Sequence, residues 1–523
     1  MKIRNFKTGW IYLLASICGF TASAQLSPDQ IQHYLSENLN KKELGINYQK
    51  EIRDFYAHIN YQTAWIQQMD TTNLNYLMDN LSSATNWGLD EKDYQYGFIS
   101  AFKKSTSRPQ NLADSLKAEI LFSDAAIHFY SDIAYGNTLP ALGYTGIKYI
   151  PDCMEIPAAM SEFISKNKIN LLTSFLSPII FEVSLIENKI NWILKVMNEN
   201  AFKEISIVSR TMDFENKPLY RKLYQLGILD SANKNVSENI LKQKIKEAQL
   251  MFNLPVNSEL NKDIIHELNI PLKVRLKQLN LSINYYRWLS CLTQNQSVIV
   301  VNIPAAYLKV YNEQKVILEM RMVVGKPSTP TFTLASTVNE VIIYPYWYVP
   351  LSIAVKELLP AIKRNPSYLD ANNYQVLDKA GKIIDPYSVN WHVLSRNNFP
   401  YTIRQGTGCD NALGLLKLNF YNPFGAYLHD TPDKNLFKQN RRFYSHGCMR
   451  MEKPIEMGHL ILKNNNIAID TLTEKGCLKS QSPVVVPSDV KIPVLVWYNP
   501  VGIDSTGNIL FFEDVYKKFN WTK

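Results

Sequence analysis

The first 290 residues carry apolar side chains at the spacing of amphipathic helices. Leu74, Leu77 and Leu81 share one helical face, and a longer helix is predicted over 116–135, where Gly136 supplies a C-cap. The same periodicity predicts helices over 171–200 (broken near Pro178), 220–229, 240–252 and 272–289. We therefore expect a helical scaffold domain over residues 25–215 and a smaller helical module over residues 216–290.

Near residue 296 the pattern changes to short β-branched and alternating runs. A strand is predicted over 297–302, and a hairpin over 307–311 and 316–324. The remaining predicted elements are strands at 338–344, 415–420, 426–429, 494–498 and 509–512, and a helix at 454–462. The last two strands indicate a terminal hairpin within 481–523. The expected fold class is a multidomain α+β protein in which residues 296–480 form a mostly-β domain.

The first 24 residues have the three parts of a secretory signal peptide. Basic residues precede an apolar run over 10–20 that is too short to span a bilayer, and Ala22-Ser-Ala24 is a cleavage site of the small-x-small type. An uncleaved anchor is the alternative, which the short run disfavours. We expect export to the periplasm or cell envelope after cleavage near Ala24, and no membrane span in the mature chain.

Charge and cysteine content narrow the function further. The chain has a formal net charge of +9, and cleavage would remove three basic residues and no acidic one. Such a diffuse positive charge does not argue for nucleic-acid binding.

Five cysteines would remain, so at least one thiol is unpaired, and Cys448 is the natural candidate. Which of Cys153, Cys291, Cys409 and Cys477 pair with one another stays open.

One cysteine and one histidine carry the strongest chemical signal. Cys448 ends a Ser445-His446-Gly447-Cys448 turn and follows His429 by 19 positions. A thiol is a nucleophile as its thiolate, and an ion pair with a nearby imidazole would favour that form. Gly447 allows a sharp turn whose backbone N–H groups could stabilise an oxyanion. These residues predict an acyl-transfer enzyme with a cysteine nucleophile.

The spacing of His429 from the Ser-His-Gly-Cys turn resembles the signature of the L,D-transpeptidases, which have the YkuD-type fold. Several other segments resemble the larger, YcbB-like subgroup of that family, and they occur in the same order. They are Val300-Val-Asn-Ile-Pro304, Val323-Val-Gly-Lys326, Pro345-Tyr-Trp-Tyr-Val-Pro350, Asn411-Ala-Leu-Gly414 and Leu428-His-Asp-Thr-Pro432. The resemblance is strong over 297–478 and looser before it. It implies a peptidoglycan-binding-like module at 216–290, here degenerate, and a capping insertion at 351–402.

The resemblance assigns roles to the residues of the motif. It implies that Cys448 is the nucleophile, that His429 is its base, and that a backbone carbonyl orients the imidazole. We expect Gly447 and Cys448 to offer oxyanion donors, His446 and Ser445 to shape the turn, and Arg450 either to brace the turn or to meet a carboxylate. Tyr427 and Trp347 are possible pocket residues. Asp430 adjoins His429 in sequence, but neighbours along a strand point apart, so its expected role is structural.

The family reaction implies both substrates and inhibitors. Cys448 would attack a peptidoglycan tetrapeptide stem before its terminal D-alanine and form a thioester. The amine of a diamino acid on a second stem would then resolve the thioester into a 3→3 cross-link. Carbapenems are implied as covalent inhibitors, and no metal or organic cofactor is implied.

Two other functions remain open at this point. One is a carboxypeptidase or other hydrolase of the same fold, in which water resolves the thioester. The other is a wall-binding scaffold whose catalytic domain is idle, which the intact Cys-His pair disfavours. A papain-like protease is a weaker option, because its cysteine precedes its histidine in the chain.

Overall fold

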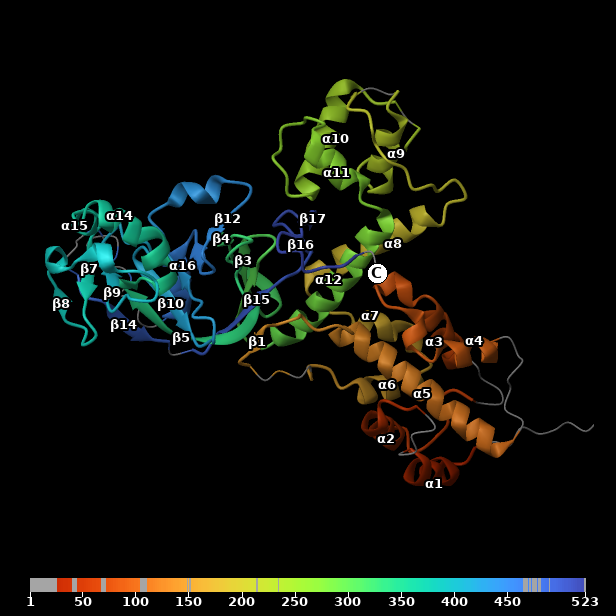
Figure 1. Ribbon diagram of the computed structural model, residues 1–523. Coiled ribbons are helices and arrows are strands. Elements are labelled where there is room, and N and C mark those ends of the chain that lie inside the picture. The colour runs from red at the N-terminus through yellow and green to blue at the C-terminus, as the bar shows by residue number, and fades with distance from the viewer. Residues whose placement is uncertain are drawn as a thin grey trace, which may run out of the picture. The chain divides into compact units, whose positions relative to one another are not determined.

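The computed structural model (Figure 1) describes residues 26–39, 45–66, 72–103, 111–147, 149, 152–212, 215–233, 235–463, 469, 472, 477, 481–488 and 490–521. The predicted signal peptide, residues 1–24, lies outside these residues. The chain divides into two compact units. The first contains residues 1–82, 91–129 and 156–173, and the second contains residues 83–90, 130–155 and 174–523.

The first unit is helical, as the apolar periodicity predicts. Its elements are α1 (Pro28–Asn38), α2 (Gln49–His58), α3 (Thr72–Ser82), η3 (Glu91–Asp93), α4 (Tyr96–Lys103), the first part of α5 (Leu112–Tyr135), α6 (Ile156–Ser165) and η4 (Ile169–Leu171). Glu119 of α5 is fully buried and accepts hydrogen bonds from the backbone N–H groups of Ala64 and Ile66. These bonds compensate for the burial of the carboxylate and tie the chain around residue 65 to the helix.

The second unit contains a mixed sheet, and all but one of its helices outside the segment 347–438 precede strands β2–β15 in the chain. These helices are η2 (Ala84–Trp87), α8 (Phe181–Met197), α9 (Lys217–Gln225), α10 (Glu238–Met251), α11 (Lys262–Asn269), α12 (Leu272–Leu292) and α16 (Pro454–Ile461), with α7 (Leu172–Leu176) at the boundary of the two units. The predicted break near Pro178 separates α7 from α8. Among the described residues, no helix is both long enough and apolar enough to cross a bilayer.

The main sheet of the second unit has the strand order β1-β5-β10-β11-β13-β4-β3-β2-β15, with β12 paired to β4 and β14 paired to β5. These strands are β1 (Tyr144–Thr145), β2 (Val298–Asn302), β3 (Tyr307–Asn312), β4 (Lys315–Gly325), β5 (Leu334–Ile343), β10 (Leu416–Phe420), β11 (Leu428–His429), β12 (Phe443–Ser445), β13 (Met449–Met451), β14 (Val484–Pro487) and β15 (Pro493–Trp497). Strands β3 and β4 form the hairpin that the sequence predicts.

Both faces of this sheet are covered, which explains its unbroken apolar runs. Val298 and Val300 of β2 pack in a core with α12, whereas Ile299 and Val301 pack on the other face with α16. Strand β15 is buried throughout and pairs with β2 and β5. Strands buried on both faces read as continuous apolar segments rather than as alternating ones.

The terminal hairpin differs from the sequence expectation in its first strand. Residues 494–498 were expected to form it, but 493–497 belong to the main sheet as β15. The hairpin consists of β16 (Val501–Ile503) and β17 (Ile509–Phe511), which pair around the turn at Asp504. The physical reason is that the fully apolar 493–497 run can be buried on two faces, whereas a two-stranded hairpin offers only one.

The mixed segment after residue 346 has its own sheet and core. Strands β6 (Trp347–Tyr348), β9 (Thr402–Gln405), β7 (Tyr374–Leu377) and β8 (Ile383–Ile384) lie in that order. Its helical parts are α13 (Leu351–Ile353), the π-helical turn η5 (Ala354–Leu358), α14 (Leu359–Arg364), α15 (Tyr368–Ala371), η6 (Pro386–Ser388) and η7 (Trp391–Val393), and η8 (Lys434–Lys438) follows later in the chain. Residues such as Leu358, Ile362 and Ile403 form a separate apolar cluster. This segment, which contains the predicted capping insertion of residues 351–402, is therefore a compact substructure in its own right.

Two disulfides account for four of the cysteines. Cys153 pairs with Cys291 and Cys409 pairs with Cys477, whereas Cys448 is a free thiol among the described residues. The sequence predicted the free thiol but left the pairing open.

We expect alkylation of the denatured, unreduced protein to label one cysteine between residues 26 and 523, namely Cys448. Labelling after reduction should reach all five. Peptide mass mapping with and without reductant measures this directly, and a Cys448→Ala protein provides the matched blank. A second labelled cysteine in the unreduced sample would contradict the pairing.

Candidate active site

The central strands bring the histidine strand next to the cysteine turn. Strand β11 lies between β10 and β13, with His429 opposite Lys417 on one side and opposite Arg450 on the other. Cys448 immediately precedes β13, and the N–H of Met449 donates to the carbonyl of Tyr427 over 3.2 Å. The sheet register therefore places the two predicted catalytic residues on adjacent strands.

The Ser-His-Gly-Cys turn is fixed by hydrogen bonds of its own. The Ser445 hydroxyl donates to the Cys448 carbonyl over 2.5 Å and accepts from the N–H of Gly447 over 3.2 Å. Gly447 has a φ of +113°, a conformation that a residue with a Cβ rarely adopts. Thr331 donates to the Gly447 carbonyl over 2.9 Å, which ties the turn to the loop after β4.

These bonds change the expected set of oxyanion donors. The N–H of Gly447 is already engaged by Ser445, whereas the N–H of Cys448 has no hydrogen-bond partner among the described residues. In this conformation, Cys448 therefore offers the more available backbone donor.

The Cys448 sulfur is partly buried and hydrogen-bonded. Tyr427 contacts it through both its backbone and its side chain, and Trp347 in turn hydrogen-bonds the Tyr427 side chain. Burial raises the pKa of the Cys448 thiol, while the hydrogen bonds of Tyr427 and the charges of Lys417 and Arg450 act to lower it. Tyr427, one of the two sequence-predicted pocket residues, thus acts on the thiol directly, and Trp347 acts on Tyr427.

His429 is buried, with an exposed fraction of 4%, and its ring is oriented by the backbone. Its Nδ1 lies 2.5 Å from the carbonyl oxygen of Asp430. A carbonyl can only accept, so Nδ1 carries the proton and Nε2 is left as an acceptor. Burial, reinforced by the positive charges of Arg450 and Lys417, lowers the pKa of His429 to about 3.

The resting pair is therefore a neutral thiol and a neutral imidazole. The sequence suggested that an ion pair would favour the thiolate, but burial disfavours the charged form of both groups. A neutral imidazole with a free Nε2 is in the correct state to accept a proton as the sulfur attacks.

The Asp430 carboxylate stabilises the strand and does not face the imidazole nitrogen. It accepts from the N–H of Leu415 over 2.9 Å and pairs with Lys434. Gly414 has a φ of +61°, and a Cβ there would lie 2.3 Å from the Asp430 carboxylate. Only glycine allows this close approach, which fixes the position of the Asp430 backbone and hence of the carbonyl that holds His429.

His446, within the turn, and Arg450, two residues after it, have different environments. His446 is exposed, and its Nε2 lies 2.7 Å from a carboxylate oxygen of Glu357 in η5, so this ion pair links the turn to the capping insertion. Arg450 is partly buried, and its Nε has no hydrogen-bond partner among the described residues. Its charge acts on both Cys448 and His429.

Comparison with known proteins agrees with this geometry. Residues 296–484 match a family model described as the L,D-transpeptidase catalytic domain (YkuD). Residues 50–178 match a second family, described as a scaffold domain. The first matched region thus contains the whole Cys448 site, and the helical first unit contains most of the scaffold match.

A Haemophilus influenzae protein whose name assigns it to the L,D-transpeptidases is 37% identical over 219 residues. The match covers 42% of this chain and 44% of that protein, so the chain spans less than half the length of this curated relative. A solved L,D-transpeptidase from Mycobacterium smegmatis is 14% identical and covers 38% of this chain and 58% of that chain, with a TM-score of 0.17. The Ldtfm–avibactam carbamoyl enzyme is also 14% identical, covers 39% and 49% of the two chains, and has the same TM-score.

Sequence reasoning missed one residue of the candidate site, Lys417. Its Nζ lies 4.1 Å from the centre of the Tyr427 ring, and its charge lowers the pKa of the Cys448 thiol. A signal was present in the sequence. The strand Leu416–Phe420 buries alternate apolar residues, so Lys417 must lie on the other face. That this face meets Tyr427 depends on the register of β10 with β11, which the sequence does not give.

We expect Tyr427→Phe to raise the pKa of the Cys448 thiol and to slow its alkylation at pH 8 about tenfold. The variant removes a hydrogen bond to the sulfur that favours the thiolate, and bonds to charged groups are worth about 1.5–3 kcal/mol. The pH dependence of iodoacetamide labelling, followed by intact mass, measures the effect. Tyr444→Phe, at an exposed position in β12, is the matched control. Identical pH profiles for Tyr427→Phe and wild type would contradict the contact.

We expect the buried His429 to make the domain over residues 296–484 sensitive to acid. Its pKa is about 3 when folded and 6.5 in the unfolded chain, so the unfolded state binds the proton first as the pH falls. Stability is thus lost between pH 6.5 and 3, by about 2–3 kcal/mol at pH 4.5. Denaturant unfolding of wild type and His429→Gln at pH 7.5 and 4.5 isolates this contribution, because other groups titrate in both proteins. Equal losses in both would show that His429 is not buried as a neutral ring.

Proposed function

We propose that this chain is an exported peptidoglycan L,D-transpeptidase that forms 3→3 cross-links through a thioester on Cys448. The observation that carries the proposal is that the free Cys448 thiol immediately precedes the strand next to that of the buried His429, whose Nδ1 is held by a backbone carbonyl. This arrangement lies within the matched catalytic domain. The proposal covers the substrate, the product and the cellular location. The signal-like residues 1–24 are the basis for the location.

In the first step, the Cys448 sulfur attacks the carbonyl carbon between the third stem residue and the terminal D-alanine. The thiol proton passes to Nε2 of His429, and the carbonyl oxygen becomes an oxyanion near the N–H of Cys448. The C–N bond then breaks, His429 returns the proton to the leaving amine, and D-alanine departs. The Asp430 carbonyl stabilises the transient imidazolium through Nδ1–H.

In the second step, the amine of a diamino acid on another stem attacks the thioester carbon. His429 accepts a proton from that amine, the C–S bond breaks, and the sulfur recovers a proton. No electrons are exchanged with an external carrier, so these steps need no redox cofactor. Carbapenems would acylate the same sulfur, and the amide C–N bond of their four-membered lactam ring would break.

The capping insertion is proposed to close over the bound stem. Trp347 in β6 reaches Tyr427, and Glu357 in η5 pairs with His446 of the cysteine turn. Both contacts connect the insertion to the nucleophile, so a movement of the insertion would alter the surroundings of the sulfur. Exclusion of water by such a closure would favour transfer to an amine over hydrolysis.

Product analysis separates transfer from its closest alternative. Purified sacculi that contain tetrapeptide stems are incubated with the mature protein, digested with muramidase and analysed by mass spectrometry. Dimers with 3→3 links are the expected product. Shortened stems without dimers would instead indicate an L,D-carboxypeptidase, and unchanged stems would indicate a wall-binding scaffold.

A further inference from the structure

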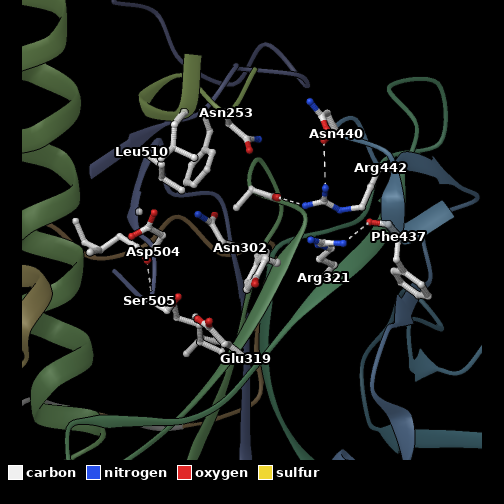
Figure 2. Close-up of a pocket in the computed structure, with 18 of the residues that line it drawn as sticks. Asn253, Asn302, Glu319, Arg321, Phe437, Asn440, Arg442, Asp504, Ser505 and Leu510 are labelled. Atoms are coloured by element: carbon white, nitrogen blue, oxygen red, sulfur yellow. Dashed lines mark hydrogen bonds between the residues drawn. The ribbon is translucent and has the colours of Figure 1, made fainter. Parts of the chain in front are cut away.

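A cavity of about 460 Å³ lies within the second unit, away from Cys448 (Figure 2). Its floor is formed by side chains of β2, β3 and β4, and its walls come from the loop after α10, the terminal hairpin and the segment 437–442. The volume falls within the range of small-molecule sites in proteins. The cavity thus joins the helical module to the chain segment that leads into the cysteine turn.

One wall of the cavity is apolar. Leu254 and Val256 follow α10, and Leu510 and Phe512 come from the terminal hairpin. Val256 has an exposed fraction of 53%, which is unusual for a large aliphatic side chain beside a cavity. Such a wall suits the apolar face of a ligand, or its methyl groups.

The opposite wall carries cations and side-chain amides. Figure 2 shows Arg321 and Arg442 side by side, with Asn440 close to them. The Arg442 guanidinium is used internally, since it donates to the carbonyls of Met322, Gln439 and Ala305. It therefore holds the segment 437–442 in place.

Most charges around the cavity are already compensated. Lys309 pairs with Glu182 and donates to the Ile503 carbonyl, and Asp504 accepts from the N–H groups of its own turn. Arg321 and Glu319 lie two positions apart on the same face of β4, so their opposite charges offset one another. The interior thus favours a neutral polar ligand over a strongly charged one.

Some polar groups in the cavity remain available to a ligand. The Tyr307 hydroxyl has no hydrogen-bond partner among the described residues, and burial raises its pKa, so it stays protonated and can donate. Arg321 is half-exposed. It makes a loose ion pair with Glu452, at 3.9 Å, and one long hydrogen bond, of 3.4 Å, to the Phe437 carbonyl, so part of its guanidinium can still donate to a ligand. Donors beside an apolar wall match a ligand with carbonyl groups, hydroxyls and methyl groups.

The cavity is connected to the catalytic turn through two elements. Strand β4 contributes Glu319 and Arg321, and its end at Gly325 pairs with Ser445 of the turn. Arg321 and Gly325 are four positions apart along the strand, which corresponds to about 13 Å. The segment 437–442 lines the cavity and continues into the same turn.

We propose that this cavity binds an N-acetylated oligosaccharide, the sugar strand from which the stem peptides extend. Sugar rings would lie against the apolar wall, and acetamido carbonyls would accept from Arg321 and Tyr307. The inference rests on the proposed function, because that function requires a peptide attached to such a strand to reach Cys448. Binding here would hold the strand while its peptide occupies the catalytic site.

The test titrates chitotetraose, a neutral N-acetylated tetrasaccharide, into the wild-type mature protein by calorimetry. Cellotetraose has the same backbone without acetamido groups and is expected to bind at least about tenfold more weakly. Arg321→Gln and Tyr307→Phe should each weaken chitotetraose binding about tenfold, since each removes a donor to a ligand oxygen. Lys262→Ala, exposed on α11 outside the cavity, should bind as wild type does. Thermal midpoints of all variants establish that they are folded.

A second arm separates this inference from the catalytic proposal. Protein whose Cys448 has been acylated by a carbapenem should still bind chitotetraose, because the two sites differ. Absence of chitotetraose binding to wild type, equal affinity for cellotetraose, or unchanged binding by both cavity variants would overturn the inference. If Cys448 is acylated in the same samples, the inference about the cavity fails while the proposed catalytic function is still supported.

Discussion

Replacing Cys448 with alanine is expected to reduce the formation of 3→3 dimers by at least about 10⁴-fold. In the proposed mechanism the thiol supplies the covalent intermediate, and removing the nucleophile of an acyl-transfer enzyme costs about this much or more. Because the other four cysteines of the mature region are in disulfides, no other thiol among the described residues can replace it. Dimer yield from tetrapeptide-containing sacculi, measured against time, is the readout.

The alanine variant should remain folded, because the turn is held by Ser445, Gly447 and Thr331 rather than by the sulfur. Tyr444→Phe, four residues earlier and exposed, is the matched control and should keep wild-type activity. Dimer formation by Cys448→Ala at a rate near wild type would show that the nucleophile lies elsewhere.

Replacing His429 with glutamine is expected to lower the rate of acylation by about 10²–10⁴-fold. The variant removes the Nε2 acceptor that takes the thiol proton, and general-base catalysis contributes about this range. The rate constant for carbapenem acylation, followed by intact mass, isolates the first chemical step. His392→Gln, exposed on the capping insertion, controls for loss of an imidazole and should react as wild type does. Wild-type acylation kinetics in His429→Gln would remove this residue from the mechanism.

The pH dependence of acylation gives His429 a second signature. Its pKa of about 3 keeps the imidazole neutral throughout the range from pH 5 to 8. The acylation rate of wild type should therefore not decline over that range through protonation of His429. An acid limb centred near 6.5 that disappears in His429→Gln would mean that the ring is solvated rather than buried.

Much of the fold follows from local patterns. The long helix α5 and the break between α7 and α8 were predicted because helical periodicity and Pro178 act locally. The hairpin of β3 and β4 was predicted for the same reason, since a short turn joins two alternating segments. Strand β15 was placed wrongly in a terminal hairpin, because its partners β2 and β5 are about 150 to 200 residues earlier in the chain.

The candidate site shows the same division between local and non-local information. The Cys448 turn and its glycine are contiguous in sequence, so their geometry could be anticipated, and Gly447 has the expected positive φ. The contribution of Lys417 and the use of the Gly447 N–H by Ser445 depend on register and side-chain rotation. The disulfide partners of Cys291 and Cys477 are 138 and 68 residues away, and no spacing rule selects them.

The central claim is that one sulfur, that of Cys448, forms an acyl-enzyme. Intact-mass measurement of the mature protein after incubation with a carbapenem tests it most directly, with Cys448→Ala treated in parallel. Wild type should gain the mass of one carbapenem, mapped to the peptide that contains Cys448, and the alanine variant should gain none. An adduct of the same mass on the alanine variant, or no adduct on wild type, would contradict the account.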